Sequence, residues 1–317
     1  MSLGIAPSSP RVSVVVAAYN HAPFLNQRLR SVLEQHYHDF EVIFLDDAST
    51  DDTARVFAPF ADDPRIRAVF NARNTGNAYV QANRGVRMAR GEYVWVAQGD
   101  DHAHPDFLAT LVPILEANPQ VGIAYCQSLA VDETGREIES LARATARLDP
   151  RRWQGDFIND GRDEIRRFLI QRNAIPTLSA VVFRKSVCEA VGYFDESLRL
   201  SGDYLTWVRM LMRSNIAFVA RPMNFFRYHG GSVRRRSSQE GLLIQGRYRV
   251  LAAIRDELGL PEAELEAAFD RVLKSWLKKM TRREKRIGLA GGLAIWRLAR
   301  GVDRRLSRRL LRGLLGL

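Results

Sequence analysis

Two adjacent carboxylates follow a strongly apolar segment in the first third of the chain. The sequence VWVAQGDDHAHPDFL, residues 94–108, runs from a buried-strand pattern directly into Asp100 and Asp101. Two like charges at the end of a buried strand repel each other and lose solvation, so they need a compensating charge. A divalent cation with oxygen ligands, Mg²⁺ or Mn²⁺, would supply it, and a phosphate-bearing substrate would complete the coordination.

Other sites for nucleotides or metals have weaker support in the sequence. His102 and His104 beside the carboxylate pair raise a zinc site as an alternative, which would compete with the diphosphate interpretation. The sequence contains no G-x-x-x-x-G-K-[ST] loop, no G-x-G-x-x-G after the first strand and no G-x-S-x-G elbow. A cation bridging phosphates to the carboxylates is therefore the available route to phosphate binding.

Alternating strand and helix patterns must position this pair. Apolar, β-branched runs predict strands at 12–19, 41–47, 65–71 and 92–97, and three- to four-residue periodicity predicts helices within 24–33, 50–60 and 77–89. Such alternation predicts a parallel, doubly wound sheet that binds ligands at the carboxyl ends of its strands. Polar residues follow each strand there, at 18–20, 46–47, 71–76 and 98–101. We expect one crevice to collect them.

Composition and charge narrow the class of protein. The 317 residues are 46% hydrophobic, which excludes a disordered chain, and only Cys126 and Cys188 are present, as expected in a reducing cytosol. No secretory signal or long apolar run is evident, so a cytoplasmic location is expected. Residues 271–317 hold 15 Lys and Arg against 2 acids, whereas residues 1–270 hold 32 and 34. The basic charge lies in the tail, which argues against nucleic-acid binding by the body.

Four motifs occur in order along the chain: VSVVVAAYNHAPFLNQRLRSVLEQHYHDFEVIFLDDASTDDT, NTG, QANRGVRMARGEYVWVAQGDD and SAVVFRKSVCEAVGYFDESLRLSGDYLTWVRM. Together they resemble the inverting family 2 glycosyltransferases of GT-A fold, over about residues 11–232. The resemblance implies a nucleotide-sugar-binding half at 1–104, an acceptor-binding half at 105–235 and a basic helical extension at 236–317. It also implies Mn²⁺ or Mg²⁺, a nucleoside-diphosphate sugar, with UDP-sugars favoured, and a glycan or lipid-linked acceptor.

The resemblance assigns donor-side roles by position. Tyr19 would lie against the nucleotide base, Asp47 would hydrogen-bond it, and Arg73 would contact base or phosphate. Asp100 would bind the ribose and Asp101 the metal, although the two roles can be exchanged. Many relatives read D-x-D-D, whereas this chain has Gln98 at the first position, which removes one negative charge and should weaken metal binding before the donor arrives.

On the acceptor side the resemblance assigns a base and a further metal contact. Asp203, in SGDYLTWVRM, would take the proton of the acceptor hydroxyl; the alternative is a simple helix cap. His229 would close the metal or diphosphate site, and Arg227 and residues 234–236 would face phosphate. The alternative functions are a non-catalytic nucleotide-binding or scaffold protein and a nucleotidyltransferase on a similar sheet.

The tail suggests a surface function. Residues 295–317 place Ile295, Leu298, Val302, Leu306 and Leu310 along one stripe, with arginines mostly elsewhere. A basic amphipathic helix of this kind suits an anionic membrane surface, where a lipid-linked acceptor would be found. The alternative is a helix that packs on the enzyme itself or on a second subunit of a homodimer.

Overall fold

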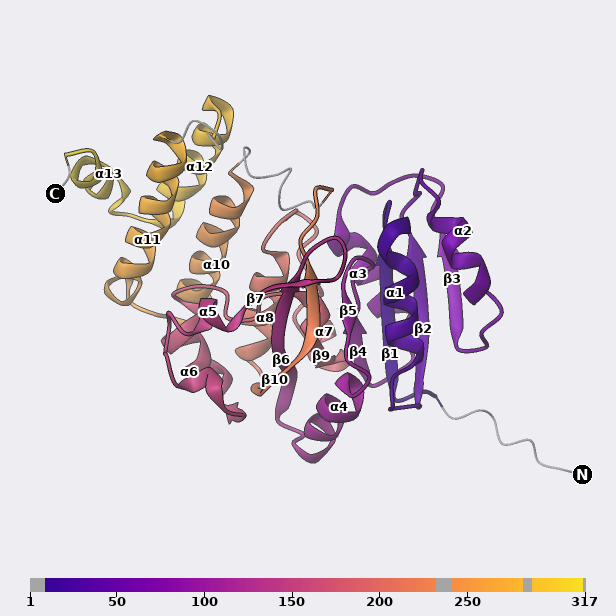
Figure 1. Cartoon of the computed structure of the whole chain (residues 1–317). Helices are drawn as coiled ribbons and strands as arrows, with labels where there is room; N and C mark the ends of the chain where they lie inside the picture. The colour runs from indigo at the N-terminus through magenta and orange to yellow at the C-terminus, as the bar shows by residue number, and fades with distance from the viewer. Residues whose placement is uncertain (1–8, 232–240, 282–286, 316–317) are drawn as a thin grey trace, which may run out of the picture.

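The structure is a computed structural model that describes residues 9–231, 241–281 and 287–315 (Figure 1). One ten-stranded mixed sheet runs through the body of the described chain, and helices α10 to α13 lie at one side of it. The strand order is β3-β2-β1-β4-β9-β6-β10-β5, with β7 beside β6 and β8 beside β10. The expected mainly parallel, doubly wound sheet with a helical extension is therefore confirmed.

The first part of the sheet is parallel throughout. β1 (Val12–Ala18) pairs in parallel with β2 (Phe40–Asp46) and β4 (Tyr93–Val96), and β2 pairs with β3 (Ile66–Phe70). The connecting helices are α1 (Ala22–Leu33), α2 (Thr53–Phe57) and α3 (Ala78–Met88). Each predicted strand and helix is present, with bounds that differ by a few residues.

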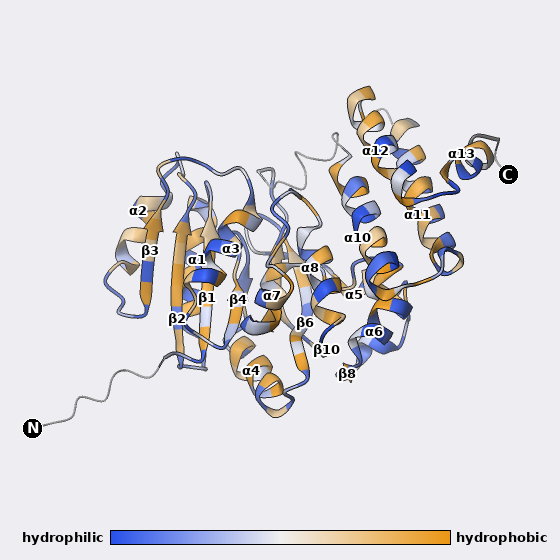
Figure 2. Cartoon of the chain, turned by 180° about the vertical axis from the view of Figure 1, so that it is seen from behind, coloured by the Kyte–Doolittle hydropathy of each residue, from blue (hydrophilic) through white to orange (hydrophobic). Residues whose placement is uncertain are grey.

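The apolar run of β1 follows from burial on both of its faces. Val14 and Val16 belong to the hydrophobic cluster that contains Leu29 of α1, whereas Val15 belongs to the cluster that contains Val86 of α3. A strand covered on both faces has no solvent side, so its residues need not alternate with polar ones. Figure 2 shows β1 and β2 coloured hydrophobic along most of their length.

The second part of the sheet contains antiparallel as well as parallel strand pairs, and its strand β10 ends beside the segment that follows β4. β9 (Val181–Arg184) lies antiparallel between β4 and β6 (Val121–Val131), and β10 (Asn215–Arg227) runs parallel to β6. The end of β10 also pairs with the short β5 (His102–Ala103), which follows β4. The remaining elements here are β7 (Glu137–Ser140), β8 (Phe157–Asn159), α4 (Phe107–Ala117), α5 (Ala142–Thr145), α6 (Gly161–Glu164), α7 (Lys185–Ala190) and α8 (Gly202–Leu211).

The C-terminal helices pack on the body of the enzyme. They are α10 (Leu242–Leu258), α11 (Glu262–Thr281), α12 (Leu289–Val302) and α13 (Leu306–Leu315). Tyr248 and Ile254 of α10 and Phe269 of α11 are buried in the same cluster as Trp207 of α8. The extension therefore shares one hydrophobic core with the sheet.

The expected continuous helix over 295–317 is wrong in two respects. The helix ends at Val302, and α13 begins at Leu306 after Asp303, whose carboxylate accepts a hydrogen bond from the Arg305 N–H. The apolar stripe also does not face solvent, because Ile295, Val302 and Leu306 are buried in the main core and Leu298 and Leu310 pack against it. This face is used for intramolecular packing, as the alternative interpretation held.

Candidate functional site

The loops after β1 and β2 are braced against each other at the carboxyl edge of the sheet. Asn20 and Ala48 both adopt left-handed backbone conformations, with φ of 55° and 60°, which are unfavourable for residues other than glycine. Asn20 Oδ1 accepts a hydrogen bond from the Thr50 N–H at 2.8 Å, and Ser49 Oγ accepts one from the Asn20 N–H at 2.9 Å. Tyr19 lies on this braced turn with 38% of its surface exposed.

Asp47 is directed into the loop that follows β3. Its carboxylate accepts hydrogen bonds from the Thr75 N–H and Oγ1, from Asn71 Nδ2 at 2.7 Å and from Gln81 Nε2 at 2.7 Å. Its backbone carbonyl accepts one from Asn74 Nδ2. In this structure Asp47 therefore organises the 71–77 loop, which also carries the exposed Arg73.

Asp100 and Asp101 point in different directions. Asp101 is 1% exposed and accepts a 2.9 Å hydrogen bond from the Arg227 N–H at the end of β10. Asp100 is half-buried, and its Oδ2 lies 3.0 Å from Nε2 of His229. The sequence left the roles of the two residues exchangeable, and this geometry favours the exchange, with Asp100 rather than Asp101 beside His229. Asp101 instead fixes the end of β10, two residues before His229.

A cluster able to hold a cation forms around Asp100. One ligand atom each from His21, Asp100 and His229 lies within 4.8 Å of the others, and all three residues are half-buried. Gly99 provides space for the His21 ring, because a Cβ atom there would lie 2.7 Å from His21 Nδ1. This buried nitrogen has no hydrogen-bond partner among the described residues. The ring of Phe24 packs against His229, at 4.9 Å between centroids.

The pKa values of Asp100 and His21 are both lowered within the cluster. Burial opposes ionisation of Asp100, but His21 and then His229 outweigh it and lower the pKa of Asp100. Burial lowers the pKa of His21, which favours the neutral imidazole that binds metals. Burial, followed by the charge of Asp100, raises the pKa of Asp101. The site therefore presents one charged carboxylate to a cation.

The zinc alternative based on the neighbouring histidines is not supported by the geometry. The ligand-capable cluster found among the described residues contains neither His102 nor His104. His102 stacks on Phe225 with ring centroids 4.5 Å apart. Burial and then the charges of Arg28 and Arg227 lower the pKa of His102 to about 3.

Asp203 lies in the first turn of α8, where the helix dipole stabilises a negative charge. The Tyr79 hydroxyl donates a 2.9 Å hydrogen bond to Asp203 Oδ1. Gly202 lies under the Tyr79 ring, since a Cβ atom at this position would come within 2.6 Å of it. Ser201, with φ of 67°, precedes the helix and makes no side-chain cap. Asp203 is therefore held by a buried tyrosine from the other half of the domain.

Comparison with known proteins decides the family. The profile described as Glycosyl transferase family 2 matches residues 13–192, more than half of the chain. The chain is a family 2 glycosyltransferase. Among curated relatives, the uncharacterized protein MT1568 of Mycobacterium tuberculosis (strain CDC 1551 / Oshkosh) is 26% identical over 278 residues, covering 87% of this chain and 85% of its own length. The succinoglycan biosynthesis protein ExoO of Rhizobium meliloti (strain 1021) is 28% identical over 197 residues, covering 62% of this chain and 54% of its own.

Solved structures share the fold of this family 2 glycosyltransferase. S. aureus TarS 1-349 in complex with UDP-GlcNAc matches with a TM-score of 0.62 and 18% identity, over 85% of this chain and 72% of that one. The mannosyltransferase PcManGT from Pyrobaculum calidifontis, in complex with GDP-Man and Mn²⁺, matches with a TM-score of 0.56 and 20% identity, over 97% and 88%. At these identities the likeness establishes the GT-A fold and no more.

Arg227 of the glycosyltransferase is a structural clamp in the described chain. Its guanidinium donates to the backbone carbonyls of Asp100 and Asp132, both at 2.8 Å, and to Gln27 Oε1 at 2.6 Å. The expected phosphate contact is therefore not its role in this structure. The arginines expected at 234–236 lie outside the described residues.

Two residues of the candidate site, His21 and Tyr79, were not predicted from the sequence. His21 joins the cation cluster from the turn after β1, and its only sequence signal is its place in YNHAP, directly after a strand end. Tyr79 had no such signal, because an aromatic residue in the first turn of an amphipathic helix usually belongs to the core.

Gln98, the departure from D-x-D-D, is held by a hydrogen bond from Thr177 Oγ1, which donates to its Oε1 at 3.2 Å.

Proposed function

We propose that this enzyme transfers a sugar from a nucleoside-diphosphate sugar to an acceptor hydroxyl, with inversion, using Asp203 as base and a divalent cation held by His21, Asp100 and His229. The observation that carries the proposal is the cluster of these three side chains at the carboxyl edge of the sheet, with ligand atoms within 4.8 Å. A single displacement requires one such cation site and one base, and the described chain offers both.

Asp203 lies at the same edge of the sheet as this cluster. Tyr79 follows the carboxyl end of β3 and binds Asp203, and Asn77 Nδ2 donates to the Glu196 carbonyl at 2.7 Å. The segment that leads into α8 is thus fastened to the loop after β3. That loop is fastened in turn to Asp47, at the end of β2. The donor and acceptor sides of the site therefore meet along one row of strand ends.

The donor is proposed to be a nucleoside-diphosphate sugar, with UDP favoured. Tyr19 has an exposed ring beside the strand ends, which can stack on a base. Because the Asp47 carboxylate already accepts several hydrogen bonds, we propose that it shapes the base pocket through the 71–77 loop. We assign Arg73, an exposed arginine of this loop, to contact with base or phosphate. The fold neighbours noted above include complexes with UDP-GlcNAc and with GDP-Man.

The residues present fit a divalent cation. A buried imidazole nitrogen without a partner and one ionised carboxylate are the groups that a metal would use. Two imidazoles and one carboxylate suit Mn²⁺ better than Mg²⁺, which prefers oxygen ligands only. We therefore favour Mn²⁺ and assign the metal contact to Asp100. Asp101 is assigned as a positioning residue, and the ribose is proposed to contact Asp100 and the residues around it. When bound, the cation would neutralise charge on the departing diphosphate.

The reaction then follows from the positions of the chain's own groups. The acceptor oxygen attacks the anomeric carbon while its proton passes to the Asp203 carboxylate. The bond between the anomeric carbon and the diphosphate oxygen breaks, and the nucleoside diphosphate leaves with the electron pair. Tyr79 holds the base in position throughout, because its hydroxyl is anchored on Asp203. Attack opposite the leaving group inverts the anomeric centre.

Thermal unfolding with UDP, GDP, CDP and dTDP, each with Mn²⁺, with Mg²⁺ or with EDTA, tests donor binding. A ligand at 100 times its dissociation constant adds about 2.7 kcal/mol to the free energy of unfolding. We expect one nucleotide to raise the melting temperature most with Mn²⁺. Asp203→Asn should keep this shift and lose about 10²- to 10⁴-fold in kcat. Equal transfer by this variant would remove the base assignment, and the absence of any nucleotide shift would remove the transferase mechanism.

We also propose attachment to an anionic membrane through α12 rather than through the buried stripe. None of the described helices combines the length and apolar character needed to cross a bilayer. Leu289, Leu293 and Trp296 are 89%, 46% and 38% exposed at helical spacing, and Arg300 lies over the Trp296 ring at 5.0 Å. An apolar row with arginines beside it complements a negatively charged lipid surface. A lipid-linked acceptor would be presented there.

A further inference from the structure

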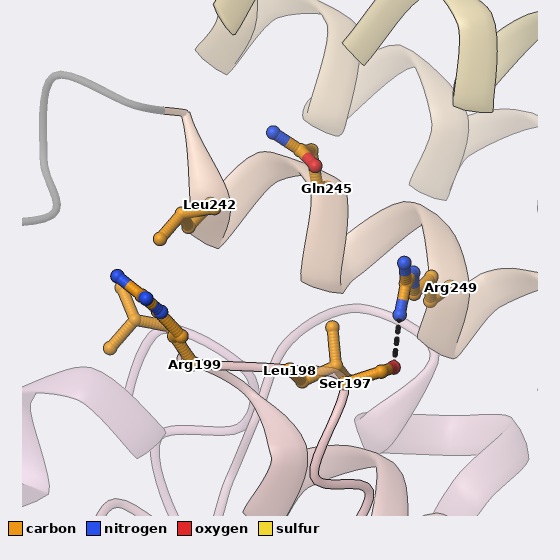
Figure 3. Close-up of a pocket in the computed structure, with 7 residues that line it drawn as sticks. Ser197, Leu198, Arg199, Leu242, Gln245 and Arg249 are labelled. Atoms are coloured by element: carbon orange, nitrogen blue, oxygen red, sulfur yellow. Dashed lines mark hydrogen bonds between the residues drawn. The ribbon is translucent and has the colours of Figure 1, made fainter. Parts of the chain in front are cut away.

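A hollow of about 290 Å³ separates the segment before α8 from the first turns of α10 (Figure 3). The body of the enzyme contributes Ser197, Leu198, Arg199 and Leu200, and the helical extension contributes Leu242, Gln245 and Arg249. In Figure 3 Arg199 lies below Leu242, near the start of α10, whereas Arg249 reaches down to Ser197. The hollow therefore exists only because the extension packs on the transferase domain.

The lining is cationic. Arg199 is exposed and Arg249 is half-buried, and neither forms an ion pair with a described residue. Arg249 donates a 2.6 Å hydrogen bond to Ser197 Oγ, and the Ser197 hydroxyl donates one of 2.6 Å to the Asp195 carboxylate, so a serine lies between the guanidinium and that acid. The nearby Glu196 is engaged elsewhere, because its carboxylate accepts a hydrogen bond from Asn83 Nδ2 at 2.8 Å. Two guanidinium groups facing one hollow are suited to an oxyanion.

The hollow adjoins the proposed base. Leu200 precedes Asp203 by three residues, so their Cα atoms are at most about 11 Å apart. Between them α10 packs closely on the body, since a Cβ atom at Gly246 would come within 2.7 Å of the Ser201 Cβ. An acceptor that spans this distance would be able to place its reacting hydroxyl at Asp203 and a second group in the hollow.

We propose that this hollow is an acceptor subsite that binds a phosphate group carried by the acceptor, through Arg199 and Arg249. The proposal rests on the proposed function, in which Asp203 is the acceptor-side base. It names the acceptor class as a phosphate-bearing glycan or lipid-linked glycan. The phosphate would be bound and not transferred, so the subsite takes part in no bond making or breaking.

Binding of inorganic phosphate to the full chain in the presence of EDTA tests the subsite without involving the cation cluster. We expect phosphate to raise the melting temperature of the parent protein more than sodium chloride of equal ionic strength. The double variant Arg199→Ala/Arg249→Gln should lose this difference, with at least a tenfold weaker phosphate affinity by calorimetry. Gln at 249 can keep the hydrogen bond to Ser197, which protects the packing of α10. Arg151→Ala, at an exposed arginine that does not line the hollow, is the matched control and should behave like the parent.

Equal phosphate effects in the parent and the double variant, or no effect in either, would overturn the subsite. Donor hydrolysis in the absence of acceptor separates this failure from failure of the proposed function. We expect the double variant to hydrolyse the donor at the parental rate, because neither arginine belongs to the donor site. If the double variant hydrolyses the donor at the parental rate and phosphate has no Arg199- and Arg249-dependent effect, the subsite alone is removed. If the parent does not bind the donor, the proposed function is removed.

Discussion

The hydroxyl group of Tyr79 donates a 2.9 Å hydrogen bond to Oδ1 of Asp203, joining residues 124 positions apart in the sequence. Burial and the charge of Asp203 raise the pKa of Tyr79 well above its usual value, so the hydroxyl remains a donor throughout the neutral range. The ring is held in place by stacking on Phe194, with centroids 6.0 Å apart. The proposed base is thus oriented by a residue of the donor half.

Tyr79→Phe tests whether this hydrogen bond positions the base. A hydrogen bond to a charged group contributes about 1.5–3 kcal/mol, so we expect kcat to fall by at least tenfold while the KM for the donor stays nearly constant. Steady-state kinetics at several pH values measures both quantities. An unchanged kcat would show that Asp203 does not depend on Tyr79.

Gly202→Ala provides a second perturbation of the same contact. The added methyl group would meet the buried Tyr79 ring at 2.6–2.9 Å and force it away from Asp203. We expect a similar loss of kcat, measured alongside the melting temperature to separate catalysis from folding. A parental rate in this variant would contradict the packing that we describe.

The cation site can be tested by comparing His21→Ala with Asp101→Asn. Because His21 belongs to the ligand cluster and Asp101 does not, we expect His21→Ala to lose the stabilisation by Mn²⁺ that is predicted for the parent. Asp101→Asn should keep most of it, with a lower melting temperature in the absence of metal, since the bond to the Arg227 N–H is weakened. Titration of Mn²⁺ followed by calorimetry gives the affinities. The reverse outcome would restore Asp101 as the metal ligand.

A pH-dependent contribution to stability is expected from Glu41. Burial opposes its ionisation, but hydrogen bonds from the Arg90 N–H, from Ser13 and from the Arg90 side chain, with the charge of Arg67, lower its pKa below 4.5. A depressed folded-state pKa stabilises the protein above the unfolded-state pKa, and this stabilisation is lost as the pH falls through the folded-state value.

Glu41→Gln should therefore be less stable than the parent by about 1–2 kcal/mol at pH 7, because the partly exposed arginines weaken the ion pairs. The difference should shrink below pH 4.5. Urea unfolding at pH 7, 5 and 4 measures it. A difference that grows on acidification would contradict the sign derived above.

Membrane attachment through α12 predicts a dependence on both lipid charge and two arginines. Each basic residue near an anionic surface contributes about 1 kcal/mol, so Arg297→Ala/Arg300→Ala should weaken binding to vesicles with one quarter anionic lipid about 30-fold. Trp296→Glu should abolish binding, whereas Ile138→Glu, at an exposed apolar residue of β7, should not affect it. Sedimentation with vesicles measures the partition. Binding to neutral vesicles as strong as binding to anionic vesicles would contradict the membrane proposal. If light scattering showed that the parent is a dimer and Trp296→Glu is not, this face would bind a second copy of the chain instead.

The parallel part of the sheet was predictable from the sequence, but the remaining strands and part of the site were not. Strands with both faces covered produce uninterrupted apolar runs, so β1 to β4 and the intervening helices were found nearly residue by residue. The sequence also placed Asp100 after a strand and Asp203 at the start of a helix, and the resemblance assigned His229, expected in a loop, to the metal or diphosphate site. The sequence could not distinguish the roles of Asp100 and Asp101. Which of two adjacent side chains points into the site depends on how the backbone turns after the strand.

The tail shows the same limitation on a larger scale. The stripe from Ile295 to Leu310 has the periodicity of a surface-binding helix, yet in the structure most of it is core. The spacing of apolar residues predicts that one face of a helix is covered, but it does not predict whether lipid or protein covers that face. The break at Asp303 was not expected either, because the buried pairing of Asp303 with Arg309 depends on tertiary contacts.

The placement of His229 at the end of β10 has a consequence for biosynthesis. Residues 1–104 carry His21 and Asp100, but the third residue of the cluster, His229, arrives only after β10 has entered the sheet between β6 and β5. A chain still emerging from the ribosome would thus hold an incomplete coordination sphere, and tight capture of the cation would wait until synthesis had passed residue 229. Loading with metal would then report on chains that have finished forming the sheet.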